Sequence, residues 1–192
     1  VVGVGVGMGT TNEVSKALSS FLETNKLPLV IDADAINCIA ENKDLLKHLS
    51  GISILTPHKQ ELIGLIGEWT DDFDMLKKVK EFSTKYNCIM VVKGAISMTI
   101  FREKVFVNTS GNPALATAGT GDVLMGMITS FVAQGYELLD AAIFGVYLHG
   151  KTADIAIEDK GYQSFIASDA IANISNAYLD MFKQSEPIKE TK

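Results

Sequence analysis

The chain has 192 residues, of which 47% are hydrophobic and 21% are charged, so it can bury one substantial core and is short for several domains. A formal net charge of −6 offers no extended basic surface, which argues against nucleic-acid and membrane partners. No apolar stretch reaches the roughly 18 residues of a membrane span, and the first residues lack the pattern of an export signal. Cys38 and Cys88 stand apart in apolar runs, which is typical of buried thiols in a cytoplasmic protein.

Short apolar runs alternate with amphipathic stretches along the chain. Strands are predicted at residues 1–6, 29–31, 52–55 and 88–92, and a hairpin at residues 98–101 and 105–107 with residues 102–104 at its tip. Helices are predicted at residues 12–23 and 73–86, and over an apolar-striped region, residues 121–157, that is broken near Gly135. This alternation predicts an α/β fold with a mainly parallel sheet covered by helices.

Residues 1–183 are expected to form one domain, because no repeat or low-complexity linker interrupts them. Residues 184–192 are polar and charged, which predicts a disordered tail. Val1 leads directly into a buried-strand pattern, without methionine and without a polar lead-in. We therefore expect the N-terminal part of the domain to be missing from this chain.

The segment from Asn108 to Asp122, which is rich in small residues, carries the strongest indication of function. It leads into a predicted helix whose apolar positions share one face, namely Leu124, Met127, Ile128 and Phe131. Its glycines let the backbone approach a ligand closely, and the first N–H groups of the helix have no partner within the helix. Such amides at the positive end of the helix dipole bind anions, so a phosphate site is predicted here.

Asp122 lies in the first turn of this helix, where the dipole favours its ionised form. A bare carboxylate would repel a bound phosphate unless it acts on the reacting hydroxyl. We therefore expect Asp122 to be a general base that takes the hydroxyl proton while the glycine amides hold the transferring phosphoryl charge. The alternative is structural: Thr120 caps the helix, and the glycines only allow tight packing.

Two further segments follow predicted strands, at the edge of the sheet where ligands collect in such folds. Glycines alternate over residues 3–9, but their spacing is not that of a dinucleotide-binding loop, so a turn with positive φ is the alternative. In residues 54–61 we expect Thr56 to be an N-cap, Pro57 the first helical residue and His58 part of the first turn. His58 there is suited to hydrogen bonding rather than to carrying charge, and a surface or capping role is its alternative.

Charged residues follow two other strands at the same edge. Asp32 and Asp34 could hold Mg²⁺ through water or bind a sugar hydroxyl, although for Asp34 we expect helix capping instead. Lys93 and Gly94 offer an ammonium and an unhindered backbone. A lysine that merely ends a strand is the alternative for Lys93.

Together and in this order, these segments resemble the ADP- or ATP-dependent NAD(P)H-hydrate dehydratases, a branch of the ribokinase-like superfamily. The resemblance covers about residues 1–181 and is most specific in residues 55–61 and 108–122, with support from residues 5–9, 32–34 and 93–97. It implies a ribokinase-like three-layer sandwich whose N-terminal part is missing here. Three residues depart from the usual family pattern: Val6 stands in place of proline, Ser97 in place of threonine and Ala118 in place of glycine.

The resemblance implies metabolite repair, in which the hydrated nicotinamide ring of NADHX or NADPHX loses water at the expense of ADP or ATP. Asp122 would deprotonate the ring hydroxyl before it is phosphorylated and the phosphate expelled. Gly7 and His58 would contact the hydrate together with Asp122, and Mg²⁺ would bridge the nucleotide phosphates, with no protein ligands assigned to it. The implied nucleotide-binding residues are Lys93, Gly94, Ala95, Ile96, Ser97, Asn112, Gly119, Thr120 and Gly121.

Two other functions stay open at this point. One is a small-molecule kinase of the same superfamily, acting on a hydroxymethylpyrimidine or thiazole alcohol, although residues 56–61 favour the dehydratase. The other is a catalytically idle nucleotide-binding module, or a structural partner of an adjoining epimerase domain. From the resemblance we expect a homo-oligomer, and an epimerase domain fused to this chain or present as a separate chain.

Overall fold

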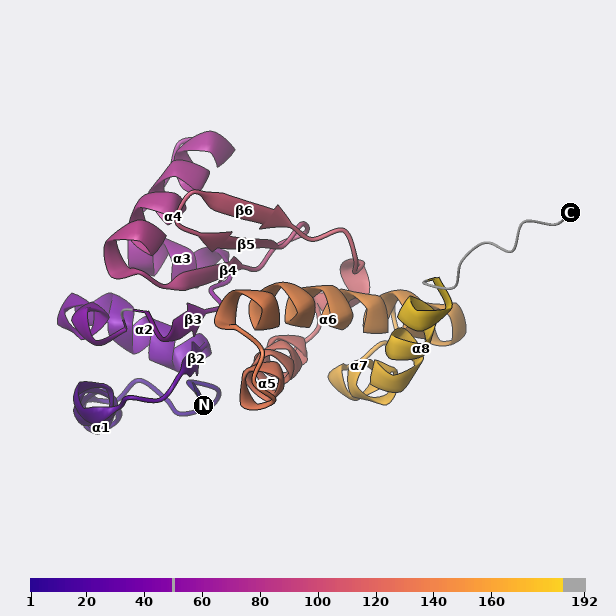
Figure 1. Cartoon of the computed structure of the whole chain (residues 1–192), viewed down its shortest axis with the longest axis horizontal. Helices are drawn as coiled ribbons and strands as arrows, with labels where there is room; N and C mark the ends of the chain where they lie inside the picture. Colours follow the sequence, from indigo (N-terminus) through magenta and orange to yellow (C-terminus); the bar gives the residue numbers. More distant parts are fainter. Residues whose placement is uncertain (50, 185–192) are drawn as a thin grey trace, which may run out of the picture. The chain divides into compact units, whose positions relative to one another are not determined.

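Six strands form one mixed sheet in the order β1-β2-β3-β4-β5-β6 (Figure 1). The computed structural model describes residues 1–49 and 51–184. Strands β1 to β4 pair in parallel, and β5 and β6 form an antiparallel hairpin beside β4, which confirms the predicted mainly parallel sheet. The strands are β1 (Val2–Val4), β2 (Leu29–Ile31), β3 (Ser53–Leu55), β4 (Ile89–Val92), β5 (Met98–Phe101) and β6 (Lys104–Val107).

Helices alternate with the parallel strands, as the sequence pattern predicted. The apolar-striped region forms two helices separated at Gly135, which has a φ of 92° and occurs where the break was expected. Most of the predicted tail, residues 185–192, lies outside the described residues, and Gln184 ends the last helix. The helices are α1 (Asn12–Thr24), α2 (Ala33–Glu41), η1 (Lys43–His48), α3 (Lys59–Ile66), α4 (Asp72–Tyr86), η2 (Pro113–Leu115), α5 (Thr120–Ala133), α6 (Leu138–Lys160), α7 (Ala167–Ala172) and α8 (Ile174–Gln184).

The chain divides into two compact units. The first comprises Val1–Asn108 and Leu124–Val146, and the second comprises Thr109–Val123 and the residues from Tyr147 onward. Each unit has its own apolar core, so each can hold its own loops in place. That residues 1–183 act as one domain stays a prediction.

Alternate residues of the strands in the first unit face two helical layers. Ile31 and Leu55 pack in one core with residues of α1 to α4, whereas Val30 and Ile54 pack in a second core with residues of α5 and α6. All four side chains are fully buried, and burial of such a side chain contributes about 1.5–3 kcal/mol. Figure 1 shows α2 and α3 on one side of β2 and β3. This arrangement confirms the three-layer α/β sandwich, and the buried Leu124, Met127, Ile128 and Phe131 confirm the predicted apolar face.

The first strand is shorter than predicted because Gly5 has a φ of 130°, outside the range of a strand. A Cβ atom at this position would lie 1.7 Å from the carbonyl oxygen of Asp32, so only glycine lets the chain pass this close to the end of β2. Gly7 and Gly9 also have positive φ. The glycine-rich segment is therefore a strand-to-helix turn that lies against the carboxyl end of the sheet.

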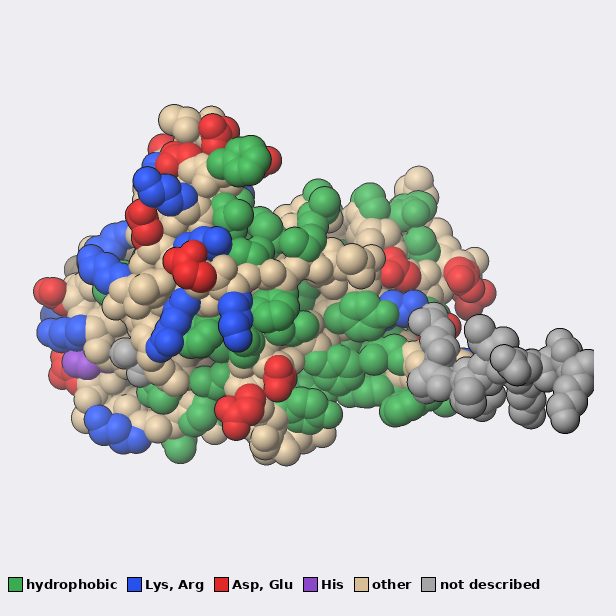
Figure 2. Space-filling model, turned by 45° about the horizontal axis from the view of Figure 1, so that its top comes forward, with side chains coloured by type: hydrophobic (Ala, Val, Ile, Leu, Met, Phe, Trp, Pro, Cys, Tyr) green, Lys and Arg blue, Asp and Glu red, His purple; other side chains and the backbone are tan. Residues whose placement is uncertain are grey.

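The second unit is built from small residues. Ala114, Ala153, Ala156 and Ala170 pack around Phe165, so loop, helix α6 and helix α7 approach one another closely. None of the described helices is both long and apolar enough to span a bilayer. On the face that Figure 2 presents, acidic and basic side chains are interleaved, and no basic patch is visible there.

Candidate functional site

The loop that leads to α5 is fixed by hydrogen bonds within the second unit. Asn112 accepts a hydrogen bond from the N–H of Ala114 at 3.1 Å and caps η2. Its side-chain amide donates to Asp154 of α6 at 2.9 Å, and the other carboxylate oxygen of Asp154 accepts from the N–H of Gly111 at 2.9 Å. Both polar atoms of the Asn112 side chain are thus engaged in the loop, and a direct contact of this side chain with a nucleotide stays a prediction.

Thr120 begins α5 and holds the end of the loop against the helix. Its hydroxyl donates to the carbonyl oxygens of Leu115 at 2.7 Å and Thr117 at 2.8 Å, so it closes the loop from the inside. The preceding Gly119 has a φ of 87°, and a Cβ there would meet the Cβ of Ala167 at 3.2 Å. The chain therefore turns sharply into the helix, with little space for any larger residue at Gly119.

The first turn of α5 keeps two backbone donors available. The N–H of Thr120 donates to Thr117 at 3.4 Å and that of Val123 to Gly119 at 3.1 Å, whereas no described residue accepts from the N–H of Gly121 or Asp122. The Asp122 side chain is exposed, and Gly121 is half-buried. This turn therefore combines free amides, the positive end of a helix dipole and an accessible carboxylate, which is the geometry expected of a phosphate site with a general base.

A buried ionic cluster lies at the carboxyl edge of the sheet in the first unit. Lys93, which follows β4, places its ammonium 2.6 Å from Asp32, whose side chain is only 2% exposed. The same ammonium lies 4.0 Å from Glu61 of α3. Because β2 and β4 lie on either side of β3, the pair of Lys93 and Asp32 links two strands that are not neighbours. Lys93 is therefore more than a strand terminus, but its charge faces carboxylates rather than open solvent.

His58, rather than the predicted Thr56, is the N-cap of α3. Its Nδ1 accepts from the N–H groups of Gln60 and Glu61, while the Glu61 carboxylate accepts from the N–H of His58, which completes a capping box. The Thr56 hydroxyl instead donates to the carbonyl oxygen of Ile31 at 3.3 Å. The expectation for Thr56 was wrong because the helix begins two residues later, after Pro57. The capping alternative for His58 is confirmed, and its contact with a hydrate stays a prediction.

The expected cap of α2 is also corrected. Asp32, not Asp34, is the N-cap of this helix and accepts from the N–H of Ala33 at 2.9 Å. Asp34 lies in the first turn and accepts from the N–H of Gly9 at 2.8 Å. This bond ties the glycine-rich turn to the start of α2, so a contact 25 residues away in sequence determines the role of Asp34.

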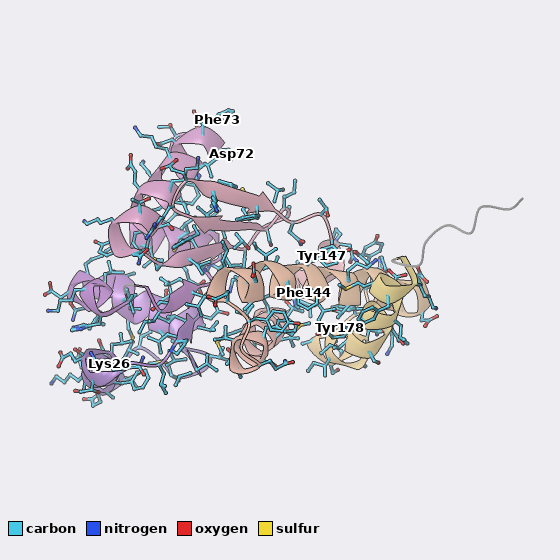
Figure 3. The ribbon with its side chains drawn as sticks, in the orientation of Figure 1. Lys26, Asp72, Phe73, Phe144, Tyr147 and Tyr178 are labelled. Atoms are coloured by element: carbon cyan, nitrogen blue, oxygen red, sulfur yellow. The ribbon has the colours of Figure 1, made fainter. Side chains whose placement is uncertain are left out.

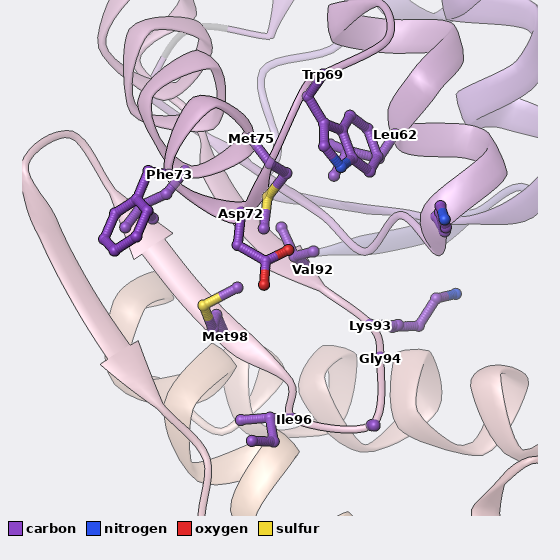
Figure 4. Close-up of a pocket in the computed structure, with 13 residues that line it drawn as sticks. Leu62, Trp69, Asp72, Phe73, Met75, Val92, Lys93, Gly94, Ile96 and Met98 are labelled. Atoms are coloured by element: carbon purple, nitrogen blue, oxygen red, sulfur yellow. The ribbon is translucent and has the colours of Figure 1, made fainter.

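A pocket of about 560 Å³ opens beside the segment Lys93 to Ile96 in the first unit. Its wall is mostly apolar and includes Trp69, Met75 and Met98. Asp72 and Phe73, at the start of α4 (Figure 3), also line it. Figure 4 shows the carboxylate of Asp72 pointing into the pocket and the Lys93 side chain pointing away from Met98. The exposed backbone of Gly94 to Ile96 is thus the part of this segment that a ligand can reach.

The structure places the predicted site residues in two groups. In the first unit, His58 and Lys93 lie in one cluster through Glu61, and Gly7 lies in the turn that follows β1. In the second unit, Asn112 and the residues from Gly119 to Asp122 belong to one loop and helix start. Sequence reasoning missed Glu61 and Asp154. The spacing of His58 and Glu61 is that of a capping box and could have indicated Glu61, but no local pattern points to Asp154.

Similarity to known proteins agrees with this geometry. A family model described as NAD(P)H-hydrate dehydratase matches residues 1–176. The ADP-dependent (S)-NAD(P)H-hydrate dehydratase of Neisseria meningitidis serogroup B is 36% identical over 176 residues, which cover 88% of this chain and 59% of that protein. Other relatives are named bifunctional NAD(P)H-hydrate repair enzymes. The chain spans 33% to 59% of the length of such relatives.

Comparison with solved structures also finds similarity to NAD(P)H-hydrate dehydratases. The ADP/ATP-dependent NAD(P)H-hydrate dehydratase of Bacillus subtilis, co-crystallised with ATP and Mg²⁺, has a TM-score of 0.74 at 25% identity, and the match covers 93% of this chain and 63% of that one. A ribokinase-like superfamily protein of Enterococcus faecalis has a TM-score of 0.74 at 24% identity, over 92% of this chain and 62% of that one, which confirms the ribokinase-like fold. The chain belongs to the NAD(P)H-hydrate dehydratase family.

Proposed function

We propose that this chain carries the nucleotide-dependent dehydratase activity of its family, in which NADHX or NADPHX loses water and NADH or NADPH is restored at the expense of ADP or ATP. One observation supports this proposal most directly. No residue in the described part of the chain accepts from the N–H groups of Gly121 and Asp122 at the start of α5, and the exposed Asp122 carboxylate lies in the same turn. A relative named an ADP-dependent dehydratase supports the choice of substrate and nucleotide.

The reaction follows from these groups. Asp122 takes the proton of the ring hydroxyl, and that oxygen then attacks the terminal phosphoryl group, whose bond to the nucleotide breaks. The amides of Gly121 and Asp122 stabilise the charge on the transferring group. The ring nitrogen then supplies the electron pair that forms a carbon–nitrogen double bond, and the carbon–oxygen bond breaks with release of phosphate. Loss of a proton from the neighbouring ring carbon to solvent gives the new carbon–carbon double bond and returns the electron pair to the nitrogen. The net result is a dehydrated ring, inorganic phosphate and a shortened nucleotide.

The other site residues have distinct roles in this proposal. Gly94 to Ser97 present backbone groups to the nucleotide, while Lys93 anchors their start through its hydrogen bonds to Asp32 and to the carbonyl oxygen of Pro57. Gly119 and Thr120 shape the turn at the phosphate. Gly7 and His58 contact the hydrate together with Asp122. Asn112 acts by holding the loop, through the contacts that it makes with Asp154 and Ala114.

Mg²⁺ accompanies the nucleotide in this proposal, and the donor set fits a cation held chiefly by phosphates. Among residues 1–49 and 51–184, no three His, Cys, Asp or Glu side chains lie close enough to enclose a metal ion. Mg²⁺ needs no such cage, because it retains water and binds substrate phosphates with one or two carboxylates at most. When bound, it would neutralise part of the phosphate charge. The Bacillus subtilis dehydratase, which was co-crystallised with ATP and Mg²⁺, supports the choice of this ion.

We extend the proposal to the setting of the enzyme. The family resemblance supports a cytoplasmic homo-oligomer, and the name of the bifunctional relatives supports a second repair activity, an epimerase, on the same or another polypeptide. The oligomeric state can be measured by light scattering of the purified protein. A separate epimerase can be sought as an activity that co-purifies with it.

The decisive experiment incubates the purified chain with NADHX or NADPHX and either ADP or ATP. The absorbance band of reduced nicotinamide should appear in step with release of inorganic phosphate. A stable phosphorylated alcohol, formed from a pyrimidine or thiazole substrate, would identify a kinase instead. Nucleotide binding by calorimetry without turnover of any hydrate would identify an idle binding module.

A further inference from the structure

Glu61 is a carboxylate at an unusually buried position, with a side chain only 5% exposed. Burying an ionised carboxylate is costly unless hydrogen bonds and opposite charge compensate for the loss of water. Three polar groups lie next to Glu61. One oxygen accepts from the N–H of His58 at 2.8 Å, the other lies 3.2 Å from the His58 Nε2, and the ammonium of Lys93 is 4.0 Å away.

These contacts determine which nitrogen of His58 carries the proton. The Nδ1 atom accepts from two backbone N–H groups, those of Gln60 at 3.1 Å and Glu61 at 3.3 Å, so it bears no hydrogen. The proton of the ring is therefore on Nε2, and an oxygen of Glu61 lies 3.2 Å from that atom. The ring itself remains 54% exposed, so a ligand can still reach its face and edge.

Glu61 also completes the surroundings of Lys93. The Asp32 oxygen that accepts from the ammonium also accepts from the N–H of Ala33, so Asp32 holds Lys93 and caps α2 with one atom. The backbone N–H of Lys93 donates to Pro57, immediately before His58. Lys93 is thus tied to the β3–α3 connection by its backbone and to Asp32 by its side chain, and the exposed residues Gly94 to Ile96 follow directly.

We propose that Glu61 is a positioning residue that orients His58 on the substrate side of the site and Lys93 at the base of the nucleotide segment. The proposal rests on the proposed function for the identity of the two ligands. A carboxylate suits this position because it accepts from the backbone N–H of His58 and places a negative charge near the Nε2 of His58 and the ammonium of Lys93. Glutamine keeps an acceptor for the backbone N–H of His58 but lacks the negative charge.

The test compares Glu61→Gln with Glu68→Gln, which removes the same charge from an exposed glutamate seven positions later. In the ligand-free protein, ¹⁵N-edited NMR should give separate signals for the protonated and bare ring nitrogens of His58, assigned with His58→Asn. The signal of Nε2 should shift in Glu61→Gln, because the negative charge 3.2 Å away is removed, and should stay in place in Glu68→Gln. The KM for the hydrate should rise about tenfold in Glu61→Gln, with a smaller rise for the nucleotide and a smaller change in kcat.

His58→Asn provides a second variant, because asparagine still caps a helix but lacks the ring. It should reproduce the rise in the KM for the hydrate while leaving α3 folded. An unchanged His58 spectrum in Glu61→Gln would overturn the proposal without reference to any ligand. A changed spectrum with an unchanged KM for the hydrate would limit Glu61 to capping α3, and this result would also overturn the proposal. Absence of turnover in the unmodified protein, in contrast, would refute the proposed function.

Discussion

The side-chain amide of Asn112 donates a hydrogen bond of 2.9 Å to Asp154, 42 residues later in the chain. Since Asp154 also accepts from the N–H of Gly111, one carboxylate of α6 holds two consecutive residues of the loop before α5. The free amides of Gly121 and Asp122 follow that loop. The position of the proposed phosphate site within the second unit therefore depends on Asp154 of α6.

Replacing Asp154 with alanine should lower the free energy of unfolding by about 1–3 kcal/mol, because two donors of the loop lose a charged acceptor. It should also weaken ADP binding, since the loop must then be ordered at the cost of binding energy. Chemical denaturation and calorimetry measure the two effects. Asp159→Ala is the matched control, because Asp159 is exposed on the same helix. Equal effects of the two substitutions would contradict the role of Asp154.

Gly150 of α6 is a second point at which the loop depends on the helix. A Cβ at this position would lie 2.6 Å from the carbonyl carbon of Ser110 and 2.8 Å from the nitrogen of Gly111. Because these are backbone atoms, Gly150→Ala should destabilise the protein by about 1–3 kcal/mol or more. Gly126→Ala, in an open part of α5 where a Cβ meets nothing within 4 Å, should instead stabilise it by about 0.5–1 kcal/mol. Thermal unfolding shows whether each variant is more or less stable than the unmodified protein. A loss of stability in both variants would contradict the explanation that Gly150→Ala acts through contact with Ser110 and Gly111.

The sequence predicts those parts of the fold that local patterns determine. The face of α5 that includes Leu124 and Ile128 follows from helical periodicity, and the break at Gly135 follows from a residue that adopts positive φ easily. Strand positions are predicted within a few residues, and β1 ends early because Gly5 lies against Asp32. Such an end depends on a neighbouring strand, which a local pattern does not contain.

The site is predicted less completely than the fold, for the same reason. The turn at Gly121 and Asp122, where we propose the phosphate site, is a continuous segment, so its amides and carboxylate can be anticipated from the sequence. Asp34 and Asp154 make their bonds to residues 25 and 42 positions away, and no spacing rule links them to these partners. The error at Thr56 is of another kind, because the preference of proline for the first helical position outweighed the capping box formed by His58 and Glu61.

The two thiols should be unreactive in the folded protein. Burial raises the pKa of Cys88 to about 12, and burial together with nearby carboxylates raises that of Cys38. The thiolate, which is the reactive form, is therefore scarce at mildly alkaline pH. A disulfide reagent at that pH should titrate no thiol in the native protein and both after unfolding in guanidinium. Because the pKa of Cys88 falls on unfolding, its contribution to stability should be lost as pH rises above about 8.5. Rapid reaction of the native protein would mean that these sites open.

Trp69 offers a direct optical signal for the pocket, because it is the single tryptophan of the chain and lines the pocket beside Lys93 to Ile96. If the nucleotide contacts that segment, its binding should change the fluorescence of Trp69. Titration with ADP should give a saturable change whose midpoint agrees with calorimetry, and Trp69→Phe should bind ADP without the signal. Binding seen by calorimetry with no change in fluorescence would place the nucleotide away from this segment.

Asp122→Asn separates catalysis from binding most cleanly. The substitution keeps the size of the side chain and the free amides of the first turn but removes the base, so kcat for hydrate dehydration should fall by about 10²–10⁴. ADP affinity should stay nearly the same or rise slightly, because a charge that repels phosphate is gone. Asp140→Asn is the matched control, since Asp140 is an exposed acid in the first turn of α6. Stopped-flow absorbance and calorimetry measure the two quantities. Full activity in Asp122→Asn would remove this carboxylate from the mechanism, and a large loss of ADP affinity would mean that it serves the nucleotide rather than the reacting hydroxyl.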